Sequence, residues 1–244
     1  MPALGPGRRN GSYGIDAPYL LPIPILLIAV NLFAGIVSRS VGPFVGAAAV
    51  TACAGLGLYA SRRGKFVVWA DLLDQLALRG DEQILDIGCG RGAVLLMAAQ
   101  RLTTGRAVGV DLWKRGDQSG NDIEATRRNA AAEGVADCVD LQTADMIALP
   151  FEDNRFDLVV SSLAIHNVKP ASGRDRAVEE ALRVLRPGGR LMIADIFATR
   201  QYRACLARLG ITDVTHRDLG WRMWWGGPWV PTHLVTAIKP RSPD

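Results

Sequence analysis

The residue types that could do chemistry gather at one turn, in the stretch 84–92 (ILDIGCGRG). An apolar run holds Asp86 near its end, and Gly88, Gly90 and Gly92 then alternate before a helical pattern begins. This order predicts a strand, a tight turn and the start of a helix. Glycines at such a turn let the backbone come close to a ligand, because no Cβ stands in the way. The stretch therefore predicts a binding site for a cofactor with a phosphate or nucleoside group.

Two further acidic residues lie where predicted strands end. Asp111 ends the second strand, 25 residues after Asp86, where a carboxylate can accept hydrogen bonds from ribose hydroxyls. Asp145 follows the third strand, where it can accept from an adenine amino group while Met146 covers the ring. Ligands of open parallel sheets bind at the carboxyl ends of the strands, around the point where the strand order reverses. We therefore expect these acids at one site, with Asp86 facing a cationic amino group.

Strands and helices alternate through most of the chain, which predicts a largely parallel sheet covered on both faces. The last two strands, Ile211–Arg217 and Thr232–Ile238, have no helix between them and predict an antiparallel pair. The spacing Gly88-x-Gly90-x-x-Ala93 alone also fits the dinucleotide fingerprint, so an NAD(P)-dependent oxidoreductase is an alternative. The other expected elements are strands over 83–87, 106–111, 139–143, 156–161 and 190–195 and helices over 93–101, 123–133, 174–185 and 202–209.

Several stretches together resemble the class I S-adenosylmethionine-dependent methyltransferases, in particular the type 11/25-like domains. The resemblance covers residues 66–240. Leu85–Gly92 resembles motif I of that family, and Val110–Leu112 resembles its ribose-binding acidic motif. The further similar stretches are Ala144–Met146 with Leu149–Phe151 (the adenine segment), Phe156–Ser162 (the fourth strand) and Leu182–Leu191 (the turn before the fifth strand).

This resemblance implies a fold, a cofactor and a set of binding residues. The fold would be α/β, a Rossmann-like, doubly wound sheet of seven strands that ends in an antiparallel pair, which dinucleotide enzymes lack. The cofactor would be S-adenosyl-L-methionine. The residues that the resemblance assigns to cofactor binding are Asp86, Gly88, Cys89, Gly90, Gly92, Asp111, Leu112, Asp145, Met146 and Ser161.

The chain departs from the family pattern after Asp111. Residues 113–121 form a longer, polar loop before the next predicted helix. The loop is either solvated, or a lid over the adenosine or the mouth of the acceptor site, with Trp113 packed near it.

Methyl transfer needs a base only if the acceptor must lose a proton, because proximity and alignment supply most of the catalysis. His166 follows the fourth strand, and by the resemblance this position lies near the acceptor. His166 is therefore the candidate base, with Asn167 as a possible partner in positioning the acceptor. The alternative is that both side chains only hold the loop by hydrogen bonds. A thiol acceptor would need no base.

Two apolar windows precede the domain. Residues 17–38 and 40–61 carry no charged side chain, and only Arg39 separates them. Each window is long enough to cross a hydrocarbon core about 30 Å thick. Basic residues outnumber acids at both outer ends and only one lies in the turn, so the positive-inside rule predicts a transmembrane hairpin with both ends in the cytoplasm. The alternatives are a helical pair buried against the domain and a cleaved signal peptide.

The chain therefore divides into four expected parts. Residues 1–16 are a flexible N-terminus, and residues 17–61 are the two-helix membrane hairpin. Residues 62–80 are an amphipathic connecting helix, and residues 81–244 are the methyltransferase domain. The expected location is the membrane, with the catalytic domain facing the cytoplasm.

Charge and cysteine usage exclude several classes of protein. The net charge is +4 over 244 residues, but residues 1–65 hold six Lys or Arg against one acid, and the remainder is nearly neutral. A nearly neutral main domain argues against binding to nucleic acid. The four cysteines and three histidines are scattered with no CxxC pair, so neither a disulfide framework nor a metal site is expected.

Four of the six tryptophans fall in the segment 221–229. This segment either packs in the core between the last strands or forms an apolar rim for a hydrophobic acceptor or for the membrane surface. With the hairpin it predicts a membrane-associated methyltransferase that acts on a small lipophilic acceptor: a lipid, a quinone-like ring or a thiol. The alternative from another class is a membrane module that binds S-adenosylmethionine without catalysis.

Overall fold

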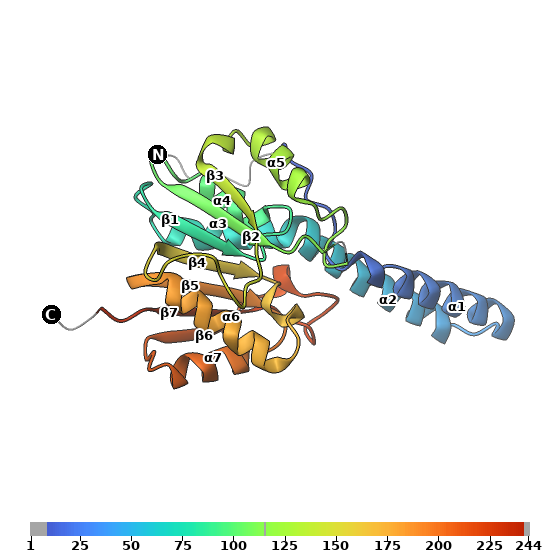
Figure 1. Ribbon diagram of the computed structural model, residues 1–244. Coiled ribbons are helices and arrows are strands. Elements are labelled where there is room, and N and C mark those ends of the chain that lie inside the picture. The colour runs from blue at the N-terminus through green and yellow to red at the C-terminus, as the bar shows by residue number, and fades with distance from the viewer. Residues whose placement is uncertain (1–8, 115, 242–244) are drawn as a thin grey trace.

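The computed structural model describes residues 9–114 and 116–241, and a seven-stranded sheet lies at its centre (Figure 1). The strand order is β3-β2-β1-β4-β5-β7-β6. The pairs among β1 to β5 are parallel, and β7 is antiparallel to both β5 and β6. The predicted doubly wound sheet with a late antiparallel pair is confirmed. The strands are β1 Gln83–Ile87, β2 Arg106–Asp111, β3 Val139–Thr143, β4 Phe156–Ser162, β5 Leu185–Asp195, β6 Val214–Asp218 and β7 His233–Ile238.

Helices cover both faces of this sheet. On one face, Val178 of α6 and Leu206 of α7 share an apolar cluster with the inward side chains of β4 and β5. On the other face, Trp69 of α3 and Val94 of α4 pack against β1 and β4, and α5 adds a third cluster beside α4. The helices are α3 Lys65–Gln75, α4 Ala93–Ala99, α5 Ile123–Ala132, α6 Ala171–Val184 and α7 Thr199–Arg208.

The predicted elements of the sheet are present, and the largest shift of a boundary is at β5. This strand was expected from Arg190 but begins at Leu185, because Leu185 pairs with Phe156 across an irregularity in the β4–β5 ladder. The carboxyl ends of β1, β2, β4 and β5 lie within one residue of their expected positions. The edge of the sheet that should hold the site is therefore built as predicted.

Two long helices, α1 Pro22–Ser38 and α2 Gly42–Tyr59, form a hairpin that projects away from the sheet (Figure 1). The helices come close where Gly35 meets the ring of Phe44. Most of their large apolar side chains are exposed, and Phe33 is 70% exposed. The pair is therefore not buried against the domain. By length and composition alone, both helices are candidates for crossing a membrane.

Helix α2 continues into α3 through a π-helical turn, Ala60–Gly64. A Cβ on Gly64 would lie 1.8 Å from the carbonyl oxygen of Arg222, so only glycine lets this turn pack so closely on the tryptophan-rich segment. Helix α3 is itself a layer of the domain, because Trp69 is fully buried in it. The connecting helix expected over residues 62–80 is thus part of the fold rather than a separate linker.

Residues 9–17, which we call the N-terminal strap, lie along the domain (Figure 1). The backbone N–H groups of Asn10 and Gly11 donate to Glu133 at the end of α5. The ring of Tyr13 packs edge-on against that of Phe66, with the ring centroids 5.1 Å apart. The strap ends where Ala17 N–H donates to a carbonyl of the 113–121 loop. Residues 9–16 therefore differ from the flexible N-terminus expected for residues 1–16, and residues 1–8 lie outside the described residues.

Candidate active site

The glycine turn joins β1 to α4 and has the backbone conformation that its sequence predicts. Gly88, Gly90 and Gly92 have φ angles of +74°, +50° and +83°. The N–H groups of Gly88 and Cys89 both donate to the carbonyl of Val110, which fixes the turn to β2. A Cβ on Gly88 would come within 2.3 Å of the Cβ of Ala164, so the turn has no room for a side chain there. The backbone is thereby exposed to whatever occupies the space above it.

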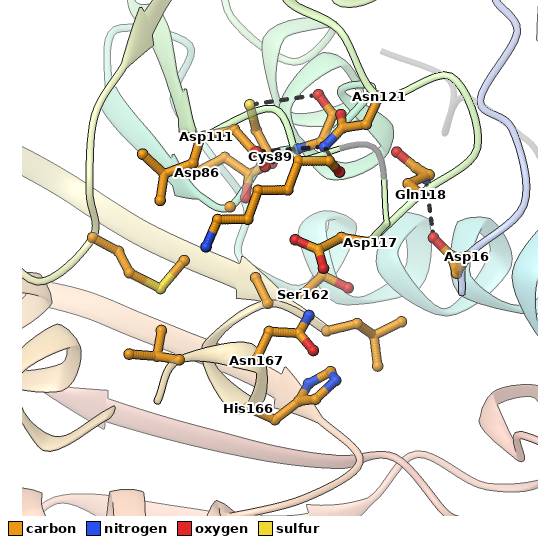
Figure 2. Close-up of a pocket in the computed structure, with 18 of the residues that line it drawn as sticks. Asp16, Asp86, Cys89, Asp111, Asp117, Gln118, Asn121, Ser162, His166 and Asn167 are labelled. Carbon is orange, nitrogen blue, oxygen red and sulfur yellow. Dashed lines mark hydrogen bonds between the residues drawn. The ribbon is translucent and has the colours of Figure 1, made fainter. Parts of the chain in front are cut away.

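That space is a cavity of about 440 Å³ at the carboxyl ends of β1, β2 and β4 (Figure 2). Its wall also includes Asp16 of the strap and Lys65 at the start of α3, so it reaches the base of the hairpin. The predicted site residues that line it are Asp86, Gly88, Cys89, Gly90, Asp111, Leu112, Asp145, Met146, His166 and Asn167.

Two predicted cofactor residues lie outside this lining. Gly92 caps the start of α4, where its positive φ ends the turn. The Ser161 hydroxyl is buried and donates to the carbonyl of Ile87 at 2.9 Å, so it holds β4 to β1. Its neighbour Ser162 lines the cavity instead. A one-residue shift along a strand exchanges the two faces of the sheet, which explains why the neighbouring residue is the one that faces the cavity.

Asp86 is buried at the wall of the cavity, and one of its carboxylate oxygens has no hydrogen-bond partner among the described residues. Its Oδ2 accepts a hydrogen bond from the Leu95 N–H at 2.9 Å, whereas its buried Oδ1 has no partner among the described residues. The pKa of Asp86 is raised to about 7, mainly by burial; the Leu95 hydrogen bond opposes this shift and the nearby Asp111 adds to it. An unpartnered acceptor with a penalised negative charge suits a cationic group such as an amino acid ammonium. The residue therefore fits the amino end of S-adenosylmethionine.

Asp111 is oriented by the turn itself. Its Oδ2 accepts from Gly90 N–H at 2.9 Å, and its Oδ1 accepts from Trp113 N–H at 2.6 Å. Burial raises its pKa, while these backbone hydrogen bonds and one from Asn121 lower it. Oδ2 keeps a second lone pair, and the Asn121 contact with Oδ1 is long at 3.5 Å, so the carboxylate can still accept from ribose hydroxyls. This geometry fits the ribose-binding role that the sequence implied.

Asp145 and Met146 follow β3 and border the same cavity. Asp145 is exposed, and its Oδ1 accepts from the N–H of Ile147 at 3.2 Å. The Cε of Met146 lies 3.3 Å from the position that a Cβ on Gly88 would take. An acid and a thioether side chain at this point suit the edge and the face of an adenine ring, respectively.

The 113–121 loop lies over the glycine turn. Gln118 is buried; its Oε1 accepts from Arg91 N–H at 2.9 Å and its Nε2 donates to Asp16 at 3.0 Å. The loop thus joins motif I to the strap, and of its two interpretations the described residues favour the lid. Trp113 is not part of the cavity wall: its indole N–H donates to Thr143 at 2.9 Å.

His166 lies in a 3-10 turn, Ile165–Asn167, just after β4, and lines the other side of the cavity (Figure 2). Its Nδ1 is 2.5 Å from Oδ1 of Asp195, the last residue of β5. Asp195 is fully buried and also accepts from the Tyr202 hydroxyl at 3.0 Å. An ionised Asp195 keeps the proton on Nδ1, which leaves Nε2 as a proton acceptor. These hydrogen bonds hold the turn to β5 and leave Nε2 free of them, so the role of His166 as the base stays a prediction.

Three positions that sequence reasoning missed belong to this site. Asp195 ends β5 as Asp111 ends β2, so the same rule about strand ends could have found it. Asp16 and Lys65 form an ion pair of 2.7 Å, with Lys65 almost fully buried, at the wall of the cavity. Nothing local in the sequence marks that pair, because its members are 49 residues apart and meet only in the fold.

The remaining histidines and cysteines take no part in the cavity chemistry, apart from Cys89 in its wall. The rings of His216 and His233 stack on the β6–β7 pair. Cys205 is fully buried, and burial raises the pKa of its thiol to about 11. Within residues 9–114 and 116–241, no group of three His, Cys, Asp or Glu side chains could hold a metal ion.

Comparison with known proteins fits this geometry. Residues 85–193 match a protein family described as a methyltransferase domain. This segment belongs to that family. The class I methyltransferase fold predicted from the sequence is thereby confirmed, together with S-adenosylmethionine as the cofactor of such domains. The match to a methyltransferase domain does not support the alternative of an NAD(P)-dependent oxidoreductase.

Curated relatives of the methyltransferase domain cover part of the chain. A ubiquinone/menaquinone biosynthesis C-methyltransferase, UbiE, of Ruegeria sp. is 37% identical over 129 residues, 52% of this chain and 48% of that protein. A demethylmenaquinone methyltransferase of Symbiobacterium thermophilum is 36% identical over 131 residues, 53% of this chain and 49% of that protein. The chain thus spans about half the length of the curated relatives it matches.

Solved structures share the fold at low sequence identity. Geranyl diphosphate methyltransferase in complex with SAM has a TM-score of 0.56 at 21% identity, over 70% of this chain and 84% of that one. The cyclase SpnF has a TM-score of 0.57 at 22% identity, over 71% of this chain and 82% of that one. Because a cyclase and a methyltransferase share this fold, activity has to be argued from the site itself.

Proposed function

We propose that this protein is an S-adenosylmethionine-dependent methyltransferase that acts on a small lipophilic acceptor. The observation that carries the proposal is one cavity with two chemically different sides. One side holds the glycine turn and the unpartnered oxygen of Asp86, and the other holds His166 against Asp195. When bound, the cofactor supplies a methyl group on a sulfonium, which is transferred by in-line displacement.

The residues of the glycine turn side bind and orient the cofactor. Asp86 would hold the amino group, Asp111 would accept from the ribose hydroxyls, and Asp145, Met146 and Leu112 would hold the adenine. The lid loop and the strap exclude water from this side. Alignment of the reacting groups, rather than covalent chemistry of the protein, is the main contribution.

His166 accepts a proton from the acceptor at Nε2. Asp195 holds the ring through Nδ1 and stabilises the imidazolium that forms, and Asn167 borders the same space. Removing the hydroxyl proton of a phenol or hydroquinone, whose pKa is near 10, makes the oxygen or a ring carbon more nucleophilic. A thiol would gain little from this base. The histidine–aspartate pair thus favours a hydroxylated acceptor over a thiol.

The lipophilic nature of the acceptor rests on two supports. The relatives include proteins named for ubiquinone, menaquinone and sterol methylation. The hairpin with its exposed apolar helices would hold the domain at a bilayer. The basic residues at its two outer ends favour the cytoplasmic side for both ends. We therefore infer a membrane location and an acceptor that partitions into the bilayer.

The test is a turnover assay with the full chain in phospholipid vesicles. Demethylmenaquinol is the acceptor, and the cofactor carries a labelled methyl group. We expect mass spectrometry to detect one labelled methyl group on the quinol ring, and a tenfold or greater loss in His166→Ala. Calorimetric binding of S-adenosylmethionine with no labelled product from this quinol or from membrane lipid extract would instead identify a non-catalytic binding module.

A further inference from the structure

Four aromatic side chains lie on the segments at the base of the hairpin, and we call them the aromatic collar: Tyr19, Tyr59, Trp221 and Trp229. Tyr59 at the end of α2 stacks on Trp221, with ring centroids 5.2 Å apart. Tyr19 and Trp229 are 65% and 68% exposed. Tyrosine and tryptophan are enriched where membrane proteins cross the boundary between lipid and water. If α1 and α2 cross a bilayer, the collar lies at that boundary.

The collar is fixed to the hairpin. A Cβ on Gly57 would lie 3.7 Å from the backbone of Gly226, and Gly64 fits against Arg222 only because it has no side chain. Trp225, in the same segment, is held by a hydrogen bond from its indole N–H to Thr232 at 3.0 Å. The tryptophan-rich segment is therefore neither free in solvent nor buried between the last strands. It is a rim attached to the end of α2.

The tryptophan-rich segment also borders the active-site cavity. Ala17 and Tyr19, which precede α1, and Trp225 all line the cavity that holds His166. In Figure 2, Asp16 lies at the right, beside Gln118 and next to a helix, whereas the acids of the glycine turn side and His166 lie farther left. The cavity thus extends from the cofactor residues to the aromatic collar.

Asp16 and Lys65 are paired at this end of the cavity. Lys65 Nζ donates to Asp16 at 2.7 Å, the hydroxyl of Ser61 donates to the same carboxylate, and Gln118 donates to its other oxygen. These contacts hold the strap in place, and the opposite charges of Asp16 and Lys65 offset each other beside an apolar molecule that passes them. The end of the cavity at the collar is therefore suited to a chain of methylene groups.

We propose that the acceptor enters the cavity directly from the bilayer, between Tyr19 and Trp225, with its reactive ring leading toward His166. Its apolar tail stays among the collar side chains and the lipid, so the molecule need not cross water. This inference rests on the proposed methyltransferase function and adds the route and the shape of the substrate: a polar ring on a long apolar tail.

The first test compares a tailed with a tail-less acceptor in vesicles of phosphatidylcholine and phosphatidylglycerol. The pair is demethylmenaquinol and 1,4-dihydroxynaphthalene, which has the same ring without the tail. Tyr19→Glu places a charge at the entrance, where an apolar tail must pass, and should lower kcat/KM for the tailed quinol about tenfold. The kcat/KM for 1,4-dihydroxynaphthalene should change much less. An equal loss for both acceptors would overturn the proposal.

Trp229→Glu is the matched control, because Trp229 belongs to the collar but does not line the cavity. It should weaken vesicle binding as much as Tyr19→Glu does, yet leave the preference for the tailed quinol unchanged. If Trp229→Glu reproduces the acceptor-dependent loss, the effect comes from membrane docking and the route is wrong.

A second measurement does not depend on the acceptor and separates failure of the route from failure of the proposed function. A bimane label on Tyr19→Cys, with Cys53 and Cys138 replaced by alanine, is placed in vesicles that contain brominated phosphatidylcholine. The brominated lipid should quench the label, and iodide in the buffer should not. The same label on Asp81→Cys, at the other end of β1, should behave in the opposite way. Quenching of the Tyr19→Cys label by iodide alone would exclude entry from the bilayer even if methyl transfer is observed.

Discussion

At the scale of single residues, we expect cofactor binding to depend on the buried carboxyl of Asp86. Its pKa is raised to about 7, mainly by burial, so the free protein resists its ionisation. A cationic amino group beside Oδ1 would reverse this effect, because an opposite charge favours the carboxylate. Binding of S-adenosylmethionine near neutral pH should therefore release a proton.

Asp86→Asn tests this linkage in the protein without cofactor. The pKa in the folded state lies above the unfolded value of about 3.9, so the stability contributed by the protonated carboxyl is full below pH 4 and lost as the pH rises through 7. In urea unfolding, Asp86→Asn should match the wild type at pH 4 and be more stable by about 1 kcal/mol or more at pH 8. Calorimetry at pH 8 should show at least a tenfold loss of cofactor affinity. A variant that is less stable than wild type at pH 8 would contradict this account.

Asp195→Asn tests the pairing of Asp195 with His166. The amide fits the same volume but no longer favours the proton on Nδ1 or stabilises the imidazolium. We expect kcat to fall by about a hundredfold, with a changed pH profile, while the affinity for S-adenosylmethionine stays within about twofold. Tyr202→Phe removes only one hydrogen bond to Asp195 and should have a much smaller effect. A uniform loss of cofactor affinity in Asp195→Asn would point to a structural role instead.

The site could be predicted from sequence where a residue follows a strand. Asp86, Asp111, Asp145 and His166 all lie at carboxyl ends of parallel strands, and the fold brings them to one cavity. Asp16 was not found, because its partners come from α3, the lid loop and the π-helical turn. Contacts of that kind depend on the packing of distant segments rather than on local patterns.

At the scale of elements, the glycine turn tolerates little change. Gly88 and Gly210 have nearly equal positive φ angles of +74° and +77°, but only Gly88 has close neighbours. The comparison therefore separates the cost of the backbone conformation from that of a clash.

Gly210→Ala should cost about 1 kcal/mol, the usual penalty for a side chain in this conformation, and leave cofactor binding intact. Gly88→Ala should cost more, because its Cβ would lie 2.3 Å from that of Ala164, and should abolish measurable binding of S-adenosylmethionine. Urea unfolding and calorimetry on both variants check this. Equal effects in the two variants would show that the turn is not in close contact with Ala164.

The helices and strands could be predicted because hydrophobic period and turn residues mark them. The observed ends of β1, β2 and β4 lie within one residue of the predicted ends, whereas β5 begins five residues earlier than predicted. That extension depends on pairing with Phe156, which no local pattern contains. The N-terminal strap was missed for a related reason: it has no regular structure of its own, and Asn129 and Glu133 supply its hydrogen bonds.

At the scale of the whole molecule, the hairpin and the cavity form one arrangement. The helices project from the domain at the point where the cavity reaches Tyr19 and Trp225. The strap and the π-helical turn connect both parts. We infer that the hairpin positions the catalytic cavity at the membrane surface, in addition to anchoring the chain.

Topology labelling tests this arrangement in intact cells. Ser40→Cys lies in the hairpin turn, and Asp81→Cys lies on the domain. With Cys53 and Cys138 replaced by alanine, a membrane-impermeant maleimide should label Ser40→Cys from outside. It should label Asp81→Cys only after the membrane is opened, as expected from the distribution of arginines. Labelling of neither site in intact cells would mean that the hairpin does not cross the bilayer.

The most direct measurement is a crystal structure of the full chain with S-adenosylhomocysteine. The account predicts the amino nitrogen of this ligand at hydrogen-bond distance, about 3 Å, from Oδ1 of Asp86. It also predicts the ribose hydroxyls on Asp111 and the sulfur facing the side of the cavity that holds His166. A ligand that leaves Asp86 Oδ1 unpartnered, or that places its sulfur away from His166, would contradict the account.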